Sequence, residues 1–334
     1  MFQKDISLKP YNTFGIDVNA ESFVVVSSQE QLFKIVSDHK DLFILSGGSN
    51  ILLTKNITKP VILLTTKGIT SIELNDDQVL VTAQAGENWH EFVLWCIDHD
   101  FGGLENLSLI PGNVGTSPIQ NIGAYGVEIK DTFYQLEALE TETGTVKSFS
   151  ASDCNFGYRD SFFKREGKGR YIILNVTFKL SQKHHELHKD YGAIQAGLEK
   201  QNNTDPSIKD ISDIIIAIRK EKLPDQKEIG NSGSFFKNPV ISIDHFEELK
   251  QVYLKIPSYP AGKDLIKVPA GWLIEQCGFK GKRFGNAGVH KNQALVLVNY
   301  GNASGTEILN LARNIQKTVK DRFAVDLEIE VNII

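Results

Sequence analysis

The sequence has few cysteines and no long apolar run, and both absences exclude classes of protein. Only three of its 334 residues are cysteine, and Cys96, Cys154 and Cys277 are scattered, so neither a disulfide framework nor a cysteine-based zinc site is expected. No window approaches the ~18 consecutive apolar residues of a membrane-spanning helix. The N-terminal stretch MFQKDISLKPYNTFGID also has no apolar core of the signal-peptide type. We therefore expect a cytoplasmic protein with no membrane insertion.

Excess positive charge is also absent. The net charge is −5 at pH 7, which argues against a nucleic-acid partner, because such proteins usually carry a basic face. With 41% hydrophobic and 23% charged residues, the composition is that of an ordinary globular protein, and the length favours more than one domain. No segment indicates an obligate protein partner.

The fingerprints of the common nucleotide-binding folds are missing. The sequence contains no G-x-x-x-x-G-K-[ST] motif, and no G-x-G-x-x-G follows a strand with an acidic residue ~20 positions later. Two glycine-rich segments, 46–50 and 111–126, are nevertheless present. Backbone N–H groups in such turns can bind a pyrophosphate. A tight structural turn explains the first segment about equally well, whereas the neutral polar residues of the second favour a ring system plus a phosphate.

Hydrophobic periodicity predicts an α+β protein. Strands are expected as two short runs within 41–53, at 61–66 and 78–86, as a hairpin around Gly144, and at 171–180, 294–300 and 325–334. Helices are expected at 88–100 with Asn88 as N-cap, at 206–225 with a capping box of Ser207 and Asp210, near 244–255, just before Gly278, and at 305–322. The segment 105–129 is apolar and rich in glycine, which indicates an ordered loop rather than a disordered linker. We place the domain boundaries at 1–66 (completed by a C-terminal strand, 323–334), 67–219 and 220–322.

Other catalytic motifs are incomplete. The stretch GNSGS (230–234) fails the last position of the G-x-S-x-G nucleophile elbow. In HHELH (184–188) the glutamate does not directly follow the first histidine, so a solvated surface is favoured over a metal site, and we expect no metal. Compensation of a helix dipole explains Arg219 and Lys220, whereas Lys222 precedes a Leu-Pro break and can instead face a cleft.

Eight sequence blocks resemble the UDP-N-acetylenolpyruvoylglucosamine reductases of bacterial cell-wall synthesis. They occur in the family's order and span nearly the whole chain, from 12–17 to 327–331. The blocks are SGGSN, AGENWHEF, GLENLSLIPGNVGTSPIQNIGAYGVE, FGYRDSFFK, KLPD, GNSGSFFKNP, AGWLIEQCG and HKNQALVLVN. The resemblance implies an α+β, three-domain flavoprotein with a two-lobed FAD-binding unit of the vanillyl-alcohol-oxidase type and an α+β substrate-binding domain. The reaction implied is NADPH-dependent reduction of UDP-N-acetylglucosamine enolpyruvate to UDP-N-acetylmuramate.

The resemblance also assigns residues to the cofactor and the substrate. Tyr191, Lys222, Asn238 and Gln293 match contacts to the UDP-sugar, and Tyr191 places the chain in the class with a tyrosine loop over the substrate. The residues implied for FAD all lie in the two glycine-rich segments: Gly47, Gly48, Ser49, Asn50, Pro111, Gly112, Gly115, Ser117, Pro118, Gln120, Asn121, Gly123, Ala124, Tyr125 and Gly126.

Three residues match the family's catalytic groups. Hydride must add at C3 of the substrate, so charge builds on C2 and its carboxylate, where preorganised donors lower the barrier. Arg159 matches the catalytic arginine, Glu330 the catalytic glutamate, and Ser234 the donor of the proton to C2. Glu330 can donate to the carboxylate if protonated, and needs Arg159 to screen it if ionised. Phe235 and Phe236 are expected to anchor the serine loop in the core, with Ser232 structural.

One departure and two alternatives accompany the resemblance. Relatives often carry an arginine two residues after the catalytic glutamate, whereas Asn332 stands here and supplies no guanidinium. Another flavin enzyme of the same superfamily, such as a carbohydrate oxidase, also fits the glycine segments. A non-catalytic UDP-sugar binder is the other alternative.

Overall fold

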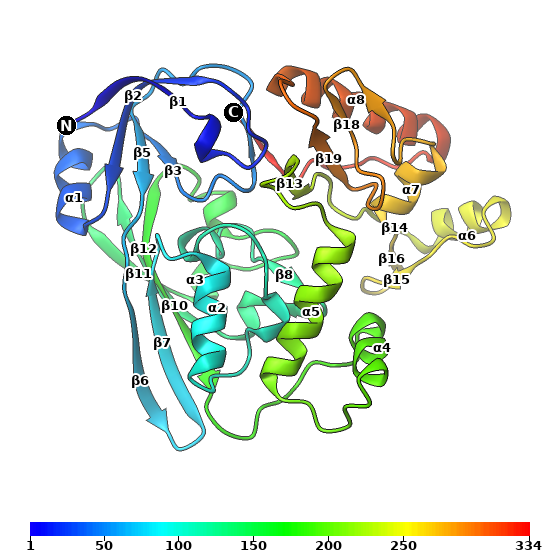
Figure 1. Cartoon of the computed structure of the whole chain (residues 1–334), viewed down its shortest axis with the longest axis horizontal. Coiled ribbons are helices and arrows are strands. Elements are labelled where there is room, and N and C mark those ends of the chain that lie inside the picture. The colour runs from blue at the N-terminus through cyan, green and yellow to red at the C-terminus, as the bar shows by residue number, and fades with distance from the viewer. The chain divides into compact units, whose positions relative to one another are not determined.

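The fold is described from a computed structural model covering all residues, Met1–Ile334 (Figure 1). The chain divides into two compact units. Unit 1 comprises 1–6, 20–47 and 57–220, and unit 2 comprises 7–19, 48–56 and 221–334. Each unit therefore combines segments that are far apart in the sequence. Our division into three domains at 66/67 and 219/220 stays a prediction.

Unit 1 contains two larger sheets with helices packed against them and a two-stranded sheet of β8 and β9. Its helices are α1 (Gln29–Asp38), α2 (Trp89–Asp98), α3 (Ala151–Cys154), α4 (Gly192–Lys200) and α5 (Ile208–Lys222), whose last two residues belong to unit 2. Its strands are β1 (Gln3–Ser7), β2 (Asn19–Val26), β3 (Phe43–Leu45), β5 (Val61–Leu64), β6 (Ile69–Asn75), β7 (Gln78–Gln84), β8 (Gly123–Ala124), β9 (Val127–Glu128), β10 (Phe133–Glu140), β11 (Val146–Ser150) and β12 (Tyr171–Ser181). The end residues Ser7 of β1 and Asn19 of β2 fall in unit 2.

The larger sheet of unit 1 carries most of its core. Its order is β11-β10-β12-β7-β6, and all its pairs are antiparallel. Helix α2 runs beside β7 (Figure 1) and packs on this sheet through Trp89 and Phe92, whose rings lie 5.8 and 5.4 Å from the ring of Phe178 in β12. The helix begins as predicted, because the side chain of Asn88 accepts the N–H of Glu91.

The smaller sheet has the order β1-β2-β5-β3. Strands β2 and β3 both pair in parallel with β5, and α1 covers them through Leu32 and Val36. The two strands predicted within 41–53 form, but they do not pair with each other. Strand β3 joins this sheet, whereas β4 (Ile51–Leu52) pairs with the C-terminal strand β20 (Asn332–Ile333) in unit 2.

Unit 2 is built around an antiparallel sheet of four strands. Strands β13 (Gly230–Ser234), β19 (Val296–Asn299), β18 (Ala287–Val289) and β17 (Arg283–Phe284) form its sheet, and α8 (Gly305–Phe323) packs on β18 and β19. A three-stranded sheet adds β14 (Val240–Ser242), β16 (Leu265–Lys267) and β15 (Tyr259–Pro260). Two further helices complete the unit: α6 (Ile243–Val252) and α7 (Ala270–Gln276).

Most predicted elements are confirmed, with one correction. The capping box of Ser207 and Asp210 starts α5, and the segment 105–129 is ordered, with buried Val114 and Ile129. The predicted strand 325–334 is wrong in length. Only β20 forms a strand, because 325–331 lies beside another chain segment through a single bridge, Phe236 to Ile329, and not through a regular ladder. No helix in the structure has both the length and the apolar character to cross a membrane.

The buried carboxylate of Glu140, at the end of β10, gives a test of stability against pH. Lys147 and Thr143 contact it at 2.9 and 2.8 Å, and Tyr171 donates at 3.0 Å. The hydrogen bond from Lys147, and next that from Thr143, lowers the pKa of Glu140 from 4.5 to about 2. The ionised form thus stabilises the fold above pH ~4.5, and this contribution is lost as the pH falls through about 2.

We therefore expect Glu140→Gln to lower the melting temperature at pH 7 by a few degrees. The difference from wild type should shrink below pH 4.5 and nearly vanish at pH 2, which thermal melts across this range will measure. Glu142→Gln, at an exposed position of the same hairpin, is the control. A Glu140→Gln deficit that stays constant down to pH 2 would contradict the ion-pair explanation.

Candidate functional site

The two glycine-rich segments meet inside unit 1. A Cβ atom on Gly47 would lie 2.8 Å from Oδ1 of Asn113 and 2.9 Å from Cα of Gly112, so only glycine lets the two backbones approach so closely. Asn113 also donates from Nδ2 to the carbonyl of Gly86 at 3.2 Å. At Gly115 a Cβ would meet the Cβ of Ala85 at 2.5 Å. The second glycine segment is therefore pressed against both the first and the end of β7.

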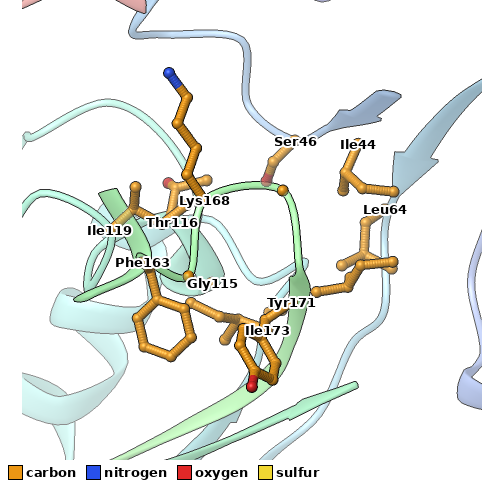
Figure 2. A pocket seen from close by; sticks show the side chains of 14 residues that line it. Ile44, Ser46, Leu64, Gly115, Thr116, Ile119, Phe163, Lys168, Tyr171 and Ile173 are labelled. Carbon is orange, nitrogen blue, oxygen red and sulfur yellow. The ribbon is translucent and has the colours of Figure 1, made fainter. Parts of the chain in front are cut away.

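A cavity of about 200 Å³ lies next to this junction, within unit 1. Figure 2 shows its lining, in which the side chain of Lys168 extends away from the rings of Phe163 and Tyr171. The walls are otherwise mostly apolar, with the hydroxyls of Ser46 and Thr116 as polar groups. The lining residues are Ile44, Ser46, Leu64, Ala85, Gly115, Thr116, Ile119, Phe163, Gly167, Lys168, Gly169, Tyr171, Ile172 and Ile173. Apolar walls with a few hydroxyls and one cation fit a ring system attached to a sugar and a phosphate.

Two predicted cofactor residues turn their side chains inward. Ser117 is buried and donates to the carbonyl of Val114 at 2.7 Å. Asn121 is buried with φ +46°, and its side chain contacts Glu128, Gly157 and Lys130. Only Gly115 among the predicted residues lines the cavity. The others are spread over the segment: Pro111 and Gly126 are exposed, Pro118 is buried, and Gly112, Gln120, Gly123, Ala124 and Tyr125 are partly exposed.

The remainder of the first glycine segment belongs to unit 2. The carbonyl of Gly48 accepts the N–H of Thr13 at 3.1 Å. The carbonyl of Asn50 accepts both the backbone N–H of Asn332, at 3.1 Å, and its side-chain amide, at 2.9 Å. Ser49 lies between them and is partly exposed. Asn332, noted in the sequence only for the guanidinium it lacks, thus holds the backbone of this loop.

Arg159 lies beside the second glycine segment in unit 1. Its backbone is left-handed, with φ +53°. Its guanidinium donates to the carbonyl of Gly123 at 2.5 Å and lies 4.0 Å from a carboxylate oxygen of Glu128. A Cβ on Gly123 would come within 3.0 Å of the guanidinium, so glycine is needed there. The structure therefore brings together three predicted residues, Asn121, Gly123 and Arg159, around Glu128.

The loop of Ser234 and the segment of Glu330 are joined by a backbone hydrogen bond in unit 2. The backbone N–H of Glu330 donates to the carbonyl of Phe235 at 2.9 Å. The rings of Phe235 and Phe236 are 0% and 1% exposed, so the predicted anchoring of the loop is confirmed. Ser232 is buried, whereas Ser234 is exposed. Burial of the two rings thus presents Ser234 at the surface beside the backbone of Glu330.

Two predicted substrate residues meet at the start of α7, also in unit 2. The side-chain oxygen of Asn238 accepts the N–H of Ala270, the first residue of the helix, at 2.9 Å. The side-chain oxygen of Gln293 lies 3.1 Å from the position of a Cβ on Gly271. Lys222, the last residue of α5, is exposed. Glu328 lies two residues before Glu330 in the alternating pattern. Its carboxylate forms an ion pair with Lys237, with 2.6 Å between the charged atoms.

The histidine cluster of 184–188 is divided among separate partners. His184 contacts Asp77 at 3.1 Å, and His185 contacts Ser181 at 2.7 Å and Asp100 at 3.1 Å. No group of three or more His, Cys, Asp or Glu residues is arranged to hold a metal ion. The contacts of His184 and His185 connect the segment after β12 to the rest of unit 1.

Sequence reasoning missed Glu128 and Lys168. Glu128 stands within the quoted block GAYGVE, but a lone carboxylate there carries no signal of a contact to Arg159. Lys168 belongs to GKG (167–169), a third glycine-rich stretch just before β12. The two glycines of this stretch could have indicated that it lines the same cavity as the other glycine-rich segments.

Comparisons with known proteins agree with this geometry. The profile of the FAD binding domain matches residues 20–150, and that of the UDP-N-acetylenolpyruvoylglucosamine reductase C-terminal domain matches residues 224–334. The reductase of that name from Flavobacterium johnsoniae is 56% identical over 334 residues, with 99% of each chain covered. The one from Pseudomonas putida is 48% identical, with 99% of this chain and 98% of that protein covered.

A solved structure shares the fold. The crystal structure of UDP-N-acetylenolpyruvylglucosamine reductase (MurB) from Thermus caldophilus superposes with a TM-score of 0.69 at 21% sequence identity, and 100% of this chain and 99% of that chain are covered. Together with the domain matches, this confirms the predicted fold class, an α+β three-domain flavoprotein, and FAD as the cofactor. The individual contacts to FAD stay predictions.

The tight contact at Gly115 gives a test of the cofactor site. We expect Gly115→Ala to bind FAD about tenfold more weakly, because overpacking against Ala85 costs ~1–3 kcal/mol and displaces the cavity wall. The ratio of flavin to protein absorbance and the Kd of the apoprotein for FAD measure this. Gly192→Ala is the matched control, because a Cβ there meets no atom within 4 Å. Unchanged FAD affinity in Gly115→Ala would place the cofactor away from this wall.

Proposed function

This chain belongs to the family of UDP-N-acetylenolpyruvoylglucosamine reductases, which are FAD-dependent oxidoreductases, and on that premise we propose that it reduces UDP-N-acetylglucosamine enolpyruvate with electrons from NADPH. The product is UDP-N-acetylmuramate, a precursor of peptidoglycan, and the place of action is the cytoplasm. NADPH and the enolpyruvyl substrate use the enzyme in turn. The backbone hydrogen bond from Glu330 to Phe235, the residue after Ser234, is the observation that carries this proposal, because it links the segments of two predicted catalytic residues within unit 2.

The substrate's chemistry defines what the protein must supply. The enolpyruvyl group is an alkene conjugated to a carboxylate, so a hydride added at C3 leaves a strongly basic carbon at C2 and extra charge on the carboxylate. FAD, when bound and reduced, supplies this hydride from its N5. The residues of the chain must bind the carboxylate, stabilise its developing charge and hold a proton for C2.

Ser234 suits the role of proton donor. A serine hydroxyl is a weak acid, which is sufficient because the acceptor is a strongly basic carbanion. A weak acid also keeps its proton until the hydride has arrived. The buried rings of Phe235 and Phe236 fix the loop, so the exposed hydroxyl is held by a rigid backbone. Ser232, which is buried two residues earlier, is a structural residue.

Arg159 and Glu330 serve the substrate carboxylate. The planar guanidinium of Arg159 matches two carboxylate oxygens, and its contacts to Gly123 and Glu128 preorganise it within unit 1. Glu330 donates to the same carboxylate when it is protonated, and Arg159 screens its charge when it is ionised. Preorganised donors at a developing charge are the largest source of rate acceleration in many enzymes.

The remaining predicted contacts bind the sugar nucleotide. Lys222, exposed at the end of α5, supplies a cation for the diphosphate. Asn238 and Gln293, both at the first turn of α7, present amides to the polar groups of the sugar and phosphates. Tyr191 covers the UDP-sugar.

Separating the two half-reactions tests Ser234. In Ser234→Ala, bleaching of the flavin by NADPH should proceed at the wild-type rate, because no proton is delivered to C2 at that stage. Reoxidation by the enolpyruvyl substrate should slow by at least ~10²–10⁴-fold, the range typical of general acid catalysis. Anaerobic stopped-flow absorbance at the flavin band follows both steps.

Ser232→Ala is the control for the same loop and should retain both rates. Two results would contradict the proposal: normal reoxidation in Ser234→Ala, or a purified wild-type protein that is colourless. Rapid oxygen consumption with a simple sugar, without response to NADPH, would instead favour a carbohydrate oxidase.

The substitution Arg159→Lys tests whether the reaction needs the shape of the guanidinium or only its positive charge. Lysine keeps the positive charge but loses the bidentate geometry, so we expect reoxidation by the substrate to slow by about 10²–10³-fold while FAD content stays normal. The control is Arg165→Lys, an arginine of the same segment that pairs with Asp160. An equal loss of reoxidation rate in both variants would mean that these arginines serve the folding of the segment and not the substrate.

A further inference from the structure

Tyr191 does not stand alone in unit 1. Its ring meets the ring of Tyr125 edge-on, with 5.2 Å between centroids and an interplanar angle of 84°. This is the favoured geometry of an aromatic pair, in which the positive edge of one ring meets the negative face of the other. Tyr125 belongs to the second glycine segment, whereas Tyr191 immediately precedes α4. The contact therefore joins two segments that the sequence keeps well apart.

Tyr125 is in turn held by Arg219. The guanidinium of Arg219 lies near the Tyr125 hydroxyl, and its charge lowers the pKa of that hydroxyl. Nε of Arg219 donates to the carbonyl of Leu109 at 3.3 Å. Leu109 has a left-handed backbone, φ +59°, and its N–H donates to Nδ1 of His90 at 3.0 Å. Arg219 thus links α5 to the loop that begins the second glycine segment, which goes beyond compensating the dipole of its own helix.

The environment of Arg219 is unusual for a cation. Burial lowers its pKa, and the only group that opposes this shift is the hydroxyl of Tyr125. Burial likewise raises the pKa of Tyr125, while the nearby charge of Arg219 lowers it. This partly buried guanidinium has the Leu109 carbonyl as its hydrogen-bond acceptor and no carboxylate among these partners. Its position beside Tyr125 therefore restricts where the tyrosine hydroxyl can lie.

Asn106 ties the backbones of the same two segments together. This buried side chain donates from Nδ2 to the carbonyl of Tyr125 at 3.1 Å and to that of His188 at 2.9 Å. His188 lies three residues before Tyr191 in the sequence. One amide therefore fixes the backbone of Tyr125 and that of His188, close in sequence to Tyr191, while the rings of the two tyrosines are in contact.

We propose that Tyr125 is a positioning residue for Tyr191: held by Arg219 and Asn106, its ring sets the orientation in which Tyr191 covers the sugar nucleotide. The inference rests on the proposed function for the role of Tyr191. It differs from the sequence prediction, which assigned Tyr125 to FAD. Tyr191 is 48% exposed, so its ring packs against that of Tyr125 and still presents surface to a ligand.

A double-mutant cycle tests the proposal in the full-length flavoprotein. The variants are Tyr125→Leu, Tyr191→Leu and the double variant, and the quantity is the KM for the enolpyruvyl substrate. If Tyr125 acts through Tyr191, Tyr125→Leu raises KM about 2- to 10-fold, the range of an aromatic pair. The double variant is then no worse than Tyr191→Leu alone. The NADPH half-reaction and the flavin-to-protein absorbance ratio stay at wild-type values.

Several results would overturn the inference. Multiplicative effects of the two substitutions would mean that Tyr125 acts independently, and loss of flavin from Tyr125→Leu would place its ring against the cofactor. Tyr125→Phe keeps the ring, so its KM should lie between those of wild type and Tyr125→Leu. A loss as large as that of Tyr125→Leu would assign the effect to the hydroxyl alone. A wild-type enzyme that does not reduce the substrate contradicts the proposed function, whereas an active wild type with multiplicative variants contradicts this inference alone.

Discussion

The close approach of Gly47 to Gly112 constrains the arrangement of unit 1. A Cβ on Gly47 would overlap Gly112 and Asn113. Any side chain at position 47 would therefore push the two glycine-rich segments apart, and their distance shapes the neighbouring cavity. The same second segment is pressed on Ala85 at Gly115. Strands β3, β5 and β12, the GKG turn and the second glycine segment all contribute to the cavity lining, as does Ala85, which follows β7. The close approaches at Gly47 and Gly115 therefore hold the second glycine segment in its place beside the cavity.

Unit 2 relies on side-chain amides where regular strand pairing stops. Asn332 binds the carbonyl of Asn50 twice, and Asn238 binds the first N–H of α7. Deeper in the unit, Asn12 donates to two carbonyls and accepts one N–H. A buried backbone group without a partner costs free energy, so these amides satisfy the irregular loops. The loop of Ser234 is fixed in the same way, because Asn231 accepts the N–H of Gly233.

Local signals in the sequence were good guides to helices and to loop anchors. Asn88, Ser207 and Asp210 marked helix starts correctly because a cap is satisfied within four residues of chain. The pair Phe235-Phe236 was correctly assigned to the core, since two adjacent large rings have little alternative to burial. The segment 325–334 was wrongly predicted as one strand. Its alternation of apolar and polar residues indicates burial on one side, but a strand also needs a pairing partner along its whole length.

The sequence by itself determined the α+β class, the position of most helices, the two glycine segments, and, through its resemblance to a known family, the chemistry that those segments serve. These features depend on residue type and short spacing, which the chain carries in one dimension. Only the tertiary structure decided that Glu128 faces Arg159, that Lys168 extends from a cavity wall, and that Tyr125 meets Tyr191. The two contacts, Glu128 with Arg159 and Tyr125 with Tyr191, and the position of Lys168 all depend on how separate elements pack. No local sequence pattern encodes the distances between those elements.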